Sequence, residues 1–463
     1  IGAFGALAAL LSMVIVLAMA VALSDYRAGI VVSIFLLPLS STHLIPRQMF
    51  GIVGMNPLNL TLAMAIVMLV YMHFFRRGEV KIPAYPRHLW VYLGLLGCAT
   101  IIGALHVSSI PPFYKLLKLI NYDSAGGYVR DTLLKPMLIL MTGFMLSIAV
   151  RNARKPNVYI AMLFCSAIVL PIIELIYIVR SGMPLSKLAA NNSRGFLNVL
   201  GMHANELGLM FNMAFALALF CFFSISGMLK KWALGIVVAI LLVAIIFTFS
   251  RGAYLGLLTA SAYFLYTRKK FRTILIGLLI LLLAILLIPD AVLERATTGA
   301  ENGDVETMSA GRVDNIWIPL LPEVMSSPIF GRGLSSILWS EAAREGTILK
   351  VGHPHSAYLG ILLDTGLLGA AMIFAFFRHM WRFFTKLAKE SCEPVWQGFF
   401  MGAAACVLVL MAQGLTDDRF TPTFPQTYLW LAYGMAIGMA AARRGAGADG
   451  SVPAEPINPS MHR

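Results

Sequence analysis

Long apolar stretches follow one another along the whole chain, and short polar segments separate them. A helix that crosses a bilayer needs roughly 20 apolar residues, within a range of about 17 to 25. On that measure the sequence predicts about thirteen membrane spans, with about twelve as the alternative. They cover residues 1–23, 28–45, 58–75, 88–105, 132–150, 157–179, 203–226, 232–249, 252–267, 273–289, 355–377, 396–415 and 424–442. The second span is the weakest because Pro38 and the polar residues Ser40 to His43 interrupt it. The predicted fold class is an all-α polytopic membrane protein.

One connection, residues 290–354, is far longer than the connections of compact proteins, which usually have about 4–6 residues. It contains a helical stretch from Arg312 to Met325 and the glycine-rich turn Gly331-Arg332-Gly333, so we expect a long loop that carries short helices. Residues 446–463 are rich in Gly, Ala and Pro and have no apolar periodicity, which is typical of a disordered tail. The remaining residues, 1–445, are predicted to form one integral membrane domain.

The composition excludes a water-soluble globular enzyme. Of the 463 residues, 59% are hydrophobic and 13% are charged, whereas soluble domains usually have about 25% charged residues. The 36 Lys and Arg exceed the 22 Asp and Glu, for a net charge of +14. In a soluble chain this excess would indicate nucleic-acid binding. Here the basic residues form short runs between apolar stretches, which is typical of cytoplasmic loops, so no nucleic-acid partner is expected.

From the third predicted span onward the basic runs fall at alternate junctions, which predicts a cytoplasmic C-terminus. The junctions on the outer side are then residues 106–131, 180–202, 250–252, 290–354 and 416–423. The chemically suggestive residues gather in or beside these outer segments. The five cysteines form no CxxC pair, and four of them fall inside apolar stretches, so neither a disulfide framework nor a zinc site is predicted.

The tight turn Ser250-Arg251-Gly252 joins two strongly apolar spans at their outer ends. An arginine at that depth is costly unless it has a partner, so ionisable groups there indicate function. The alternative is a side chain that extends to the lipid headgroups. Arg194, at another outer junction, has the same two interpretations, an anionic substrate or the headgroups.

Gly311-Arg312 begins a stretch that reads as an amphipathic helix on the membrane surface. A guanidinium group suits an anionic oxygen pair because its donors match phosphate geometry. An ordinary salt bridge to Asp314 or Glu306 is the alternative for Arg312.

His353 and His355 lie where the long loop re-enters the membrane. Imidazole can accept a hydroxyl proton near neutral pH, which makes His355 the candidate general base and His353 its neighbour. The alternatives for His355 are a helix cap, a solvated side chain or a metal ligand, although no Cys or acidic cluster completes a metal site. Asp364 lies about two and a half helical turns deeper and is expected to orient a partner group or to pair with an arginine.

These motifs, in this order and on this side, resemble the O-antigen ligase and polymerase superfamily. The resemblance covers roughly residues 190–375, and it is carried by Ser250-Arg251-Gly252, Gly311-Arg312, Gly331-Arg332-Gly333, His355-Ser356-Ala357-Tyr358-Leu359 and Asp364-Thr365-Gly366-Leu367-Leu368-Gly369. The chain departs from the family at Ser356, where the family often has Asn, and at Asp364, where Glu is usual.

The resemblance implies an inner-membrane glycosyltransferase that works at the periplasmic face without a cofactor, nucleotide sugar or metal. The implied donor is an undecaprenyl-diphosphate-linked glycan, and the acceptor is a hydroxyl of lipid A-core or of a growing polysaccharide. Membrane lipids would surround the protein. Carried over by motif, Arg251 and Arg312 bind the diphosphate and His355 is the catalytic base of an inverting displacement. Substrate-binding or supporting roles then fall to Arg194, Ser250, Arg332, His353 and Asp364.

Two other functions stay open at this point. A protein O-oligosaccharyltransferase would use the same chemistry on a protein acceptor, but the loop shows no separate domain for a polypeptide. A flippase or transporter of lipid-linked glycans would use charges such as Glu174 and Asp364 as a translocation path. The sequence shows no internal repeat, and the candidate groups gather on one side, which favours the glycosyltransferase.

Overall fold

The computed structural model describes residues 20–40, 42–43, 45, 48–49, 52–53, 55–75, 80–184, 187–188, 197, 200–268, 309, 311–416 and 419–448. Within these ranges the regular secondary structure is helical apart from a two-stranded antiparallel pair, β1 (Gln48–Met49) and β2 (Ile52–Val53), and turns and irregular segments connect the helices. The predicted class, an all-α polytopic membrane protein, is confirmed.

The α-helices are α2 (Tyr26–Leu39), α3 (Pro57–Phe75), α4 (Arg87–Ala104), α5 (Phe113–Leu116), α6 (Ala125–Val129), α7 (Lys135–Arg151), α8 (Asn157–Ala167), α9 (Val169–Ser181), α11 (Ala204–Ser224), α12 (Met228–Phe247), α13 (Arg251–Arg268), α17 (Ile318–Ser326), α18 (Glu341–Glu345), α19 (Ala357–Glu390), α20 (Pro394–Gln413) and α21 (Thr427–Ala448). Short 3₁₀ turns are η1 (Val107–Ser109), η5 (Ser336–Trp339) and η6 (Phe424–Gln426). Two segments are π-helical, η2 (Arg130–Leu134) and η4 (Val313–Trp317).

Eight helical segments in the described ranges are long and apolar enough to cross a membrane. They are Pro57–Phe75, Arg87–Ala104, Ala125–Arg151, Asn157–Ser181, Ala204–Ser224, Met228–Phe247, Ala357–Glu390 and Pro394–Gln413. Helices α13 and α21 occupy two further predicted spans but are less apolar. Almost all of predicted span 1–23, and the whole of 273–289, lie outside the described residues. The weak second span is a 14-residue helix, α2, that ends one residue after Pro38.

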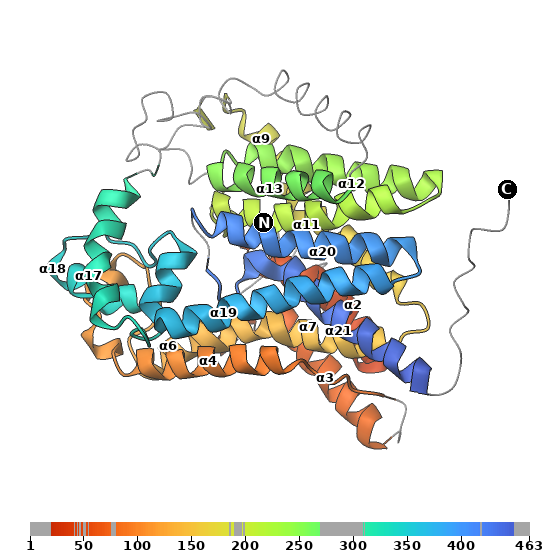
Figure 1. The fold of residues 1–463 in the computed structure, drawn as a ribbon, viewed down its shortest axis with the longest axis horizontal. Helices are drawn as coiled ribbons and strands as arrows, with labels where there is room; N and C mark the ends of the chain where they lie inside the picture. The colour runs from red at the N-terminus through yellow and green to blue at the C-terminus, as the bar shows by residue number, and fades with distance from the viewer. Residues whose placement is uncertain are drawn as a thin grey trace, which may run out of the picture.

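The long helices run side by side, and α11 lies at the centre against α12, α13 and α20 (Figure 1). Small residues allow the backbones to approach closely, as is common between membrane helices. A Cβ atom added at Gly402 of α20 would lie 2.7 Å from the Cα of Leu217 in α11. One added at Gly434 of α21 would lie 2.1 Å from the carbonyl oxygen of Gly143 in α7.

The expected long loop with short helices is confirmed in the part of 290–354 that the structure describes. Segments η4 and α17 occupy the predicted helical stretch Arg312–Met325, and α17 and α18 lie at one end of the bundle (Figure 1). The side chains of Ile318, Leu321 and Met325 are exposed along α17, as expected of an amphipathic surface helix. Helix α21 continues to Ala448, and the rest of the tail lies outside the described residues, so its disorder stays a prediction.

Helix α19 is broken at Gly366, whose backbone has φ 64° and ψ −171°. In an unbroken helix the N–H groups of Leu367 and Leu368 would bond to the carbonyls of Leu363 and Asp364. Instead these two N–H groups donate to the carbonyls of Pro328 and Ile329, at 2.8 and 3.1 Å. The break therefore turns two backbone donors toward the long loop.

The same loop satisfies the carbonyls that the break leaves unpaired. The N–H groups of Arg332 and Gly333 donate to the carbonyls of Leu363 and Asp364, both at 2.9 Å. Four hydrogen bonds thus replace the two that the helix loses. Because an unpaired backbone group is costly inside a membrane protein, this exchange fixes the loop segment 327–334 against α19. Leu334 continues the contact by donating its N–H to the carbonyl of Ala99 in α4, at 3.0 Å.

We expect Gly366→Ala to destabilise the protein strongly. The left-handed backbone conformation costs a residue with a Cβ atom about 1–2 kcal/mol. The added Cβ would also lie 2.3 Å from the carbonyl carbon of Ile329. Thermal unfolding in detergent measures the effect. The matched control is Gly94→Ala in α4, where an added Cβ meets nothing within 4 Å. An equal unfolding temperature for both variants would contradict the importance of the break.

Candidate active site

Two cavities lie side by side and share part of their walls. The loop cavity has a volume of about 500 Å³ and is bounded largely by residues 119–122, 334–338 and 350–356. The helix-end cavity has a volume of about 510 Å³ and is bounded by the ends of α7, α11 and α20. The residues that line both are Asp131, Pro136, His353, His355, Arg419, Pro422 and Thr423.

His355 is the candidate base and lies in this shared wall. Its backbone has φ 52°, a conformation that side-chain-bearing residues rarely adopt and that often marks functional sites. The ring of His353 lies 4.0 Å from its ring, centroid to centroid, and its N–H donates to Nδ1 of His353 at 3.3 Å. The N-cap of α19 is Ser356, so His355 does not have the capping role weighed above.

The beginning of α19 is attached to the end of α20. The N–H of Ala357 donates to the carbonyl of Gly414 at 2.8 Å, and the hydroxyl of Tyr358 donates to the carbonyl of Met411 at 2.9 Å. These bonds place His355 next to the residues that follow α20, where Thr416 lies.

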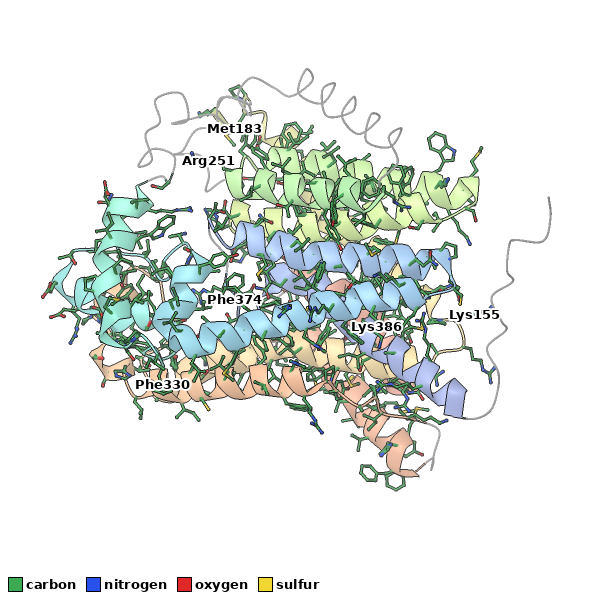
Figure 2. The ribbon with its side chains drawn as sticks, in the orientation of Figure 1. Lys155, Met183, Arg251, Phe330, Phe374 and Lys386 are labelled. Carbon is green, nitrogen blue, oxygen red and sulfur yellow. The ribbon has the colours of Figure 1, made fainter. Side chains whose placement is uncertain are left out.

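Thr416 is also the neighbour of the turn that carries Arg251. A Cβ atom added at Gly252 would lie 2.7 Å from Oγ1 of Thr416, so this turn touches the wall of the helix-end cavity. The hydroxyl of Ser250 donates to Oδ1 of Asn205, in the same wall, at 2.6 Å. Arg251 is half-buried at the first position of α13, at the end of the bundle opposite Lys155 (Figure 2).

Arg312 reaches the same threonine from the long loop. It follows Gly311, whose φ of 78° turns the chain into η4. Its guanidinium donates to the carbonyl oxygen of Thr416. Three chain segments that are distant in the sequence, those of Arg251, Arg312 and His355, therefore meet around the end of α20.

The half-buried side chain of Asp364 lines the loop cavity. Its Oδ1 accepts hydrogen bonds from the N–H and the hydroxyl of Ser336, at 2.9 and 2.8 Å. These bonds tie α19 to η5 of the long loop, and a role of Asp364 in the reaction stays a prediction.

Arg332 lines neither cavity. Its guanidinium forms an ion pair with the carboxylate of Glu323. That carboxylate also accepts from the backbone N–H groups of Glu341 and Ala342. This position suits the supporting role, because the ion pair joins the turn of Arg332 to α17, and the same carboxylate joins α17 to α18.

Two other sequence candidates are not placed in this site by the described residues. Arg194 is outside the described residues. Glu174 is fully buried in α9 and lines neither cavity, and its carboxylate oxygens have no hydrogen-bond partner. No group of three or more His, Cys, Asp or Glu in the described part of the chain could hold a metal ion.

The sequence interpretation missed Arg419 and Asp131, which line both cavities. Arg419 belongs to the outer segment 416–423, and the charged run Asp417-Asp418-Arg419 was the signal available there. Asp131 lies in the π-helical segment η2, and π-helical turns are frequent at functional sites. It forms ion pairs with Arg130 and Lys135, and Lys135 also lines the helix-end cavity.

A protein-family model described as O-antigen ligase matches residues 236–374. This match confirms the resemblance to the O-antigen ligase superfamily. The O-antigen ligase match includes Arg251, Arg312, Arg332, His355 and Asp364, whereas Asp131, Asn205, Thr416 and Arg419 lie outside it. No curated protein matches the chain. The match supports glycan transfer of the ligase or polymerase type. In general terms, the partners of such a reaction are a lipid-linked glycan and an acceptor.

The backbone conformation of His355 predicts a difference in stability between two variants at this position. His355→Gly and His355→Ala remove the same imidazole, but only glycine adopts a φ of 52° without strain. We expect the Gly variant to be more stable than the Ala variant by about 1 kcal/mol. Thermal unfolding of both variants in the same detergent measures the difference. A more stable Ala variant would show that the backbone at this position is not strained.

Proposed function

We propose that the protein transfers a glycan from undecaprenyl diphosphate to an acceptor hydroxyl at the periplasmic membrane face, as an O-antigen ligase or the related polymerase. The observation that carries this proposal is that two arginine-bearing segments contact the same residue, Thr416. The turn of Arg251 and the guanidinium of Arg312 both contact this residue, in the wall of a cavity that His355 also lines.

The arrangement suits a displacement at the anomeric carbon. The bond between that carbon and the diphosphate oxygen breaks, and its electron pair leaves on the diphosphate. Fixed guanidinium groups stabilise the negative charge that develops there. Because they are held near the ends of apolar helices, their electrostatic effect is larger than in water. The charge is then balanced by the protein, and no metal or nucleotide takes part.

The new bond forms between the acceptor oxygen and the anomeric carbon. His355 accepts the hydroxyl proton as that bond forms and later releases it to water. Direct attack from the face opposite the diphosphate inverts the anomeric configuration. The position of His355 between two cavities fits this role, because the base must touch the acceptor while the donor is bound.

The sidedness follows from the charge pattern. The basic runs at alternate junctions favour cytoplasmic loops, which supports a periplasmic position of the cavities and a cytoplasmic C-terminus. The acceptor that we propose is lipid A-core or the end of another lipid-linked glycan. A protein acceptor is disfavoured because the described loop residues belong to short helices packed on the bundle and to turns.

We expect Arg251→Ala and Arg312→Ala each to reduce glycan transfer about 100- to 1,000-fold, as loss of one donor to a developing oxyanion does. Lys at either position should restore little activity, because an ammonium group cannot form the two-pronged contact of a guanidinium. The assay is product analysis after transfer by the purified protein. The matched control is Arg268→Ala at the other end of α13, which should retain transfer. Full activity of both Lys variants would contradict the bidentate contact.

His355→Ala should lower the transfer rate about 100- to 10,000-fold, the usual contribution of a general base. The measurement uses purified protein, lipid-linked glycan, lipid A-core and a metal chelator. Wild-type protein should keep its activity with the chelator present. Unchanged turnover of the variant would rule out the base, and chelator sensitivity of the wild type would favour metal-assisted chemistry.

A further inference from the structure

The walls of the two cavities come from different parts of the fold. The helix-end cavity is bounded by Lys135 to Ile139 of α7, by residues 201–209 at the beginning of α11, and by Gln413 of α20. The residues of α11 and α20 lie at the ends of candidate membrane spans, whereas those of α7 lie inside the candidate span Ala125–Arg151. The loop cavity is bounded mainly by segments that connect helices, including residues 119–122 and 350–356, together with the first part of α19. The ends of three long helices therefore bound the first cavity, and connecting segments form most of the wall of the second.

A lipid-linked donor has a fixed geometric constraint. Its hydrocarbon tail stays in the bilayer, so its diphosphate must lie at the helix ends. The contacts of the two arginine segments agree with this constraint. Thr416 and Asn205, which these segments touch, line the helix-end cavity and do not line the loop cavity. The donor diphosphate therefore belongs in the helix-end cavity.

The loop cavity has the polar groups that bind sugar hydroxyls. Asp131 and Asp364 supply carboxylates, which accept hydrogen bonds from hydroxyl groups. Tyr122 supplies a phenol whose pKa is raised to about 12 by burial, so that it stays protonated and can donate. Lys350, at the rim, lies over the ring of Phe113, with its ammonium 5.2 Å from the ring centroid.

Asp131 is the carboxylate in the wall between the two cavities. Its side chain is 13% exposed, and the closest approaches of Arg130 and Lys135 are both to Oδ1, at 2.8 Å. Two cationic side chains thus lie against one oxygen of this carboxylate. It lines the same shared wall as His355.

We propose that the loop cavity is the subsite for the acceptor saccharide and that Asp131 binds this saccharide next to the hydroxyl that His355 deprotonates. The inference rests on the proposed function, because it assigns a binding site, the loop cavity, to the acceptor of the proposed glycan transfer. It also explains why two cavities meet at one imidazole: the donor enters from the membrane side, the acceptor enters from the loop side, and the reacting atoms meet between them.

The test is a kinetic comparison with purified full-length protein, a lipid-linked glycan donor and lipid A-core as the acceptor probe. Asp131→Asn should raise the KM for the acceptor at least about tenfold, because a carboxylate acceptor is lost. Binding of undecaprenyl diphosphate, measured separately, should not weaken. The matched control is Asp123→Asn, an exposed carboxylate that pairs with Lys115 at 2.6 Å and lines neither cavity.

A second variant keeps the inference testable if Asp131→Asn does not fold. Gly352→Leu places a side chain in the wall of the loop cavity, at a position where an added Cβ meets only the carbonyl oxygen of Leu119, at 3.7 Å. It should also raise the acceptor KM without weakening undecaprenyl diphosphate binding. An unchanged acceptor KM in both variants would overturn the inference, as would weaker diphosphate binding in Gly352→Leu. Absence of transfer by the wild-type protein, to lipid A-core and to lipid-linked glycan alike, would instead overturn the proposed function.

Discussion

The break in α19 is the constraint on which the rest of the structure depends. Backbone N–H and C=O groups at the level of membrane helices must be paired within the protein. At Gly366 the helix gives up two internal hydrogen bonds, and the loop segment 327–334 replaces them with four. The long loop is therefore joined to the bundle through its backbone. Its next residues reach α4, where Leu334 bonds to Ala99 and accepts a hydrogen bond from the hydroxyl of Tyr128 at 2.6 Å.

The position of the candidate site follows from this attachment. The part of α19 before the break carries Asp364, whose carboxylate holds Ser336 of the loop, and begins just after His355. The beginning of α19 is in turn bonded to the end of α20, at Gly414. The candidate base is thus held from two sides, and the carbonyl of Thr416, two residues after Gly414, accepts a hydrogen bond from Arg312 of the loop. Rigid helices rather than a free loop position the proposed chemistry, which favours accurate placement of reacting atoms.

Much of this fold can be predicted from the sequence. The lengths of the apolar stretches located the membrane helices because a bilayer has a fixed thickness. The break at Gly366 was not predicted, since the apolar pattern continues through it and a helical period carries no sign of a positive φ. Arg251, Arg312 and His355 were chosen as candidates because charged or imidazole groups beside apolar spans are unusual and have few structural uses. The sequence shows the local context of each of these residues, but it does not show that their segments share Thr416 as a neighbour.

The sequence by itself determined the class of fold and singled out the rarest charged and imidazole groups, because these depend on local composition and on bilayer thickness. Only the tertiary structure decided which groups share a wall. Asp131 and Arg419 look like ordinary outer-loop charges until α7, α19 and the segment after α20 come together. Arg332 looks like a third substrate arginine until Glu323 is seen beside it. Pairings between segments far apart in the chain depend on packing, and no local pattern of residues records them.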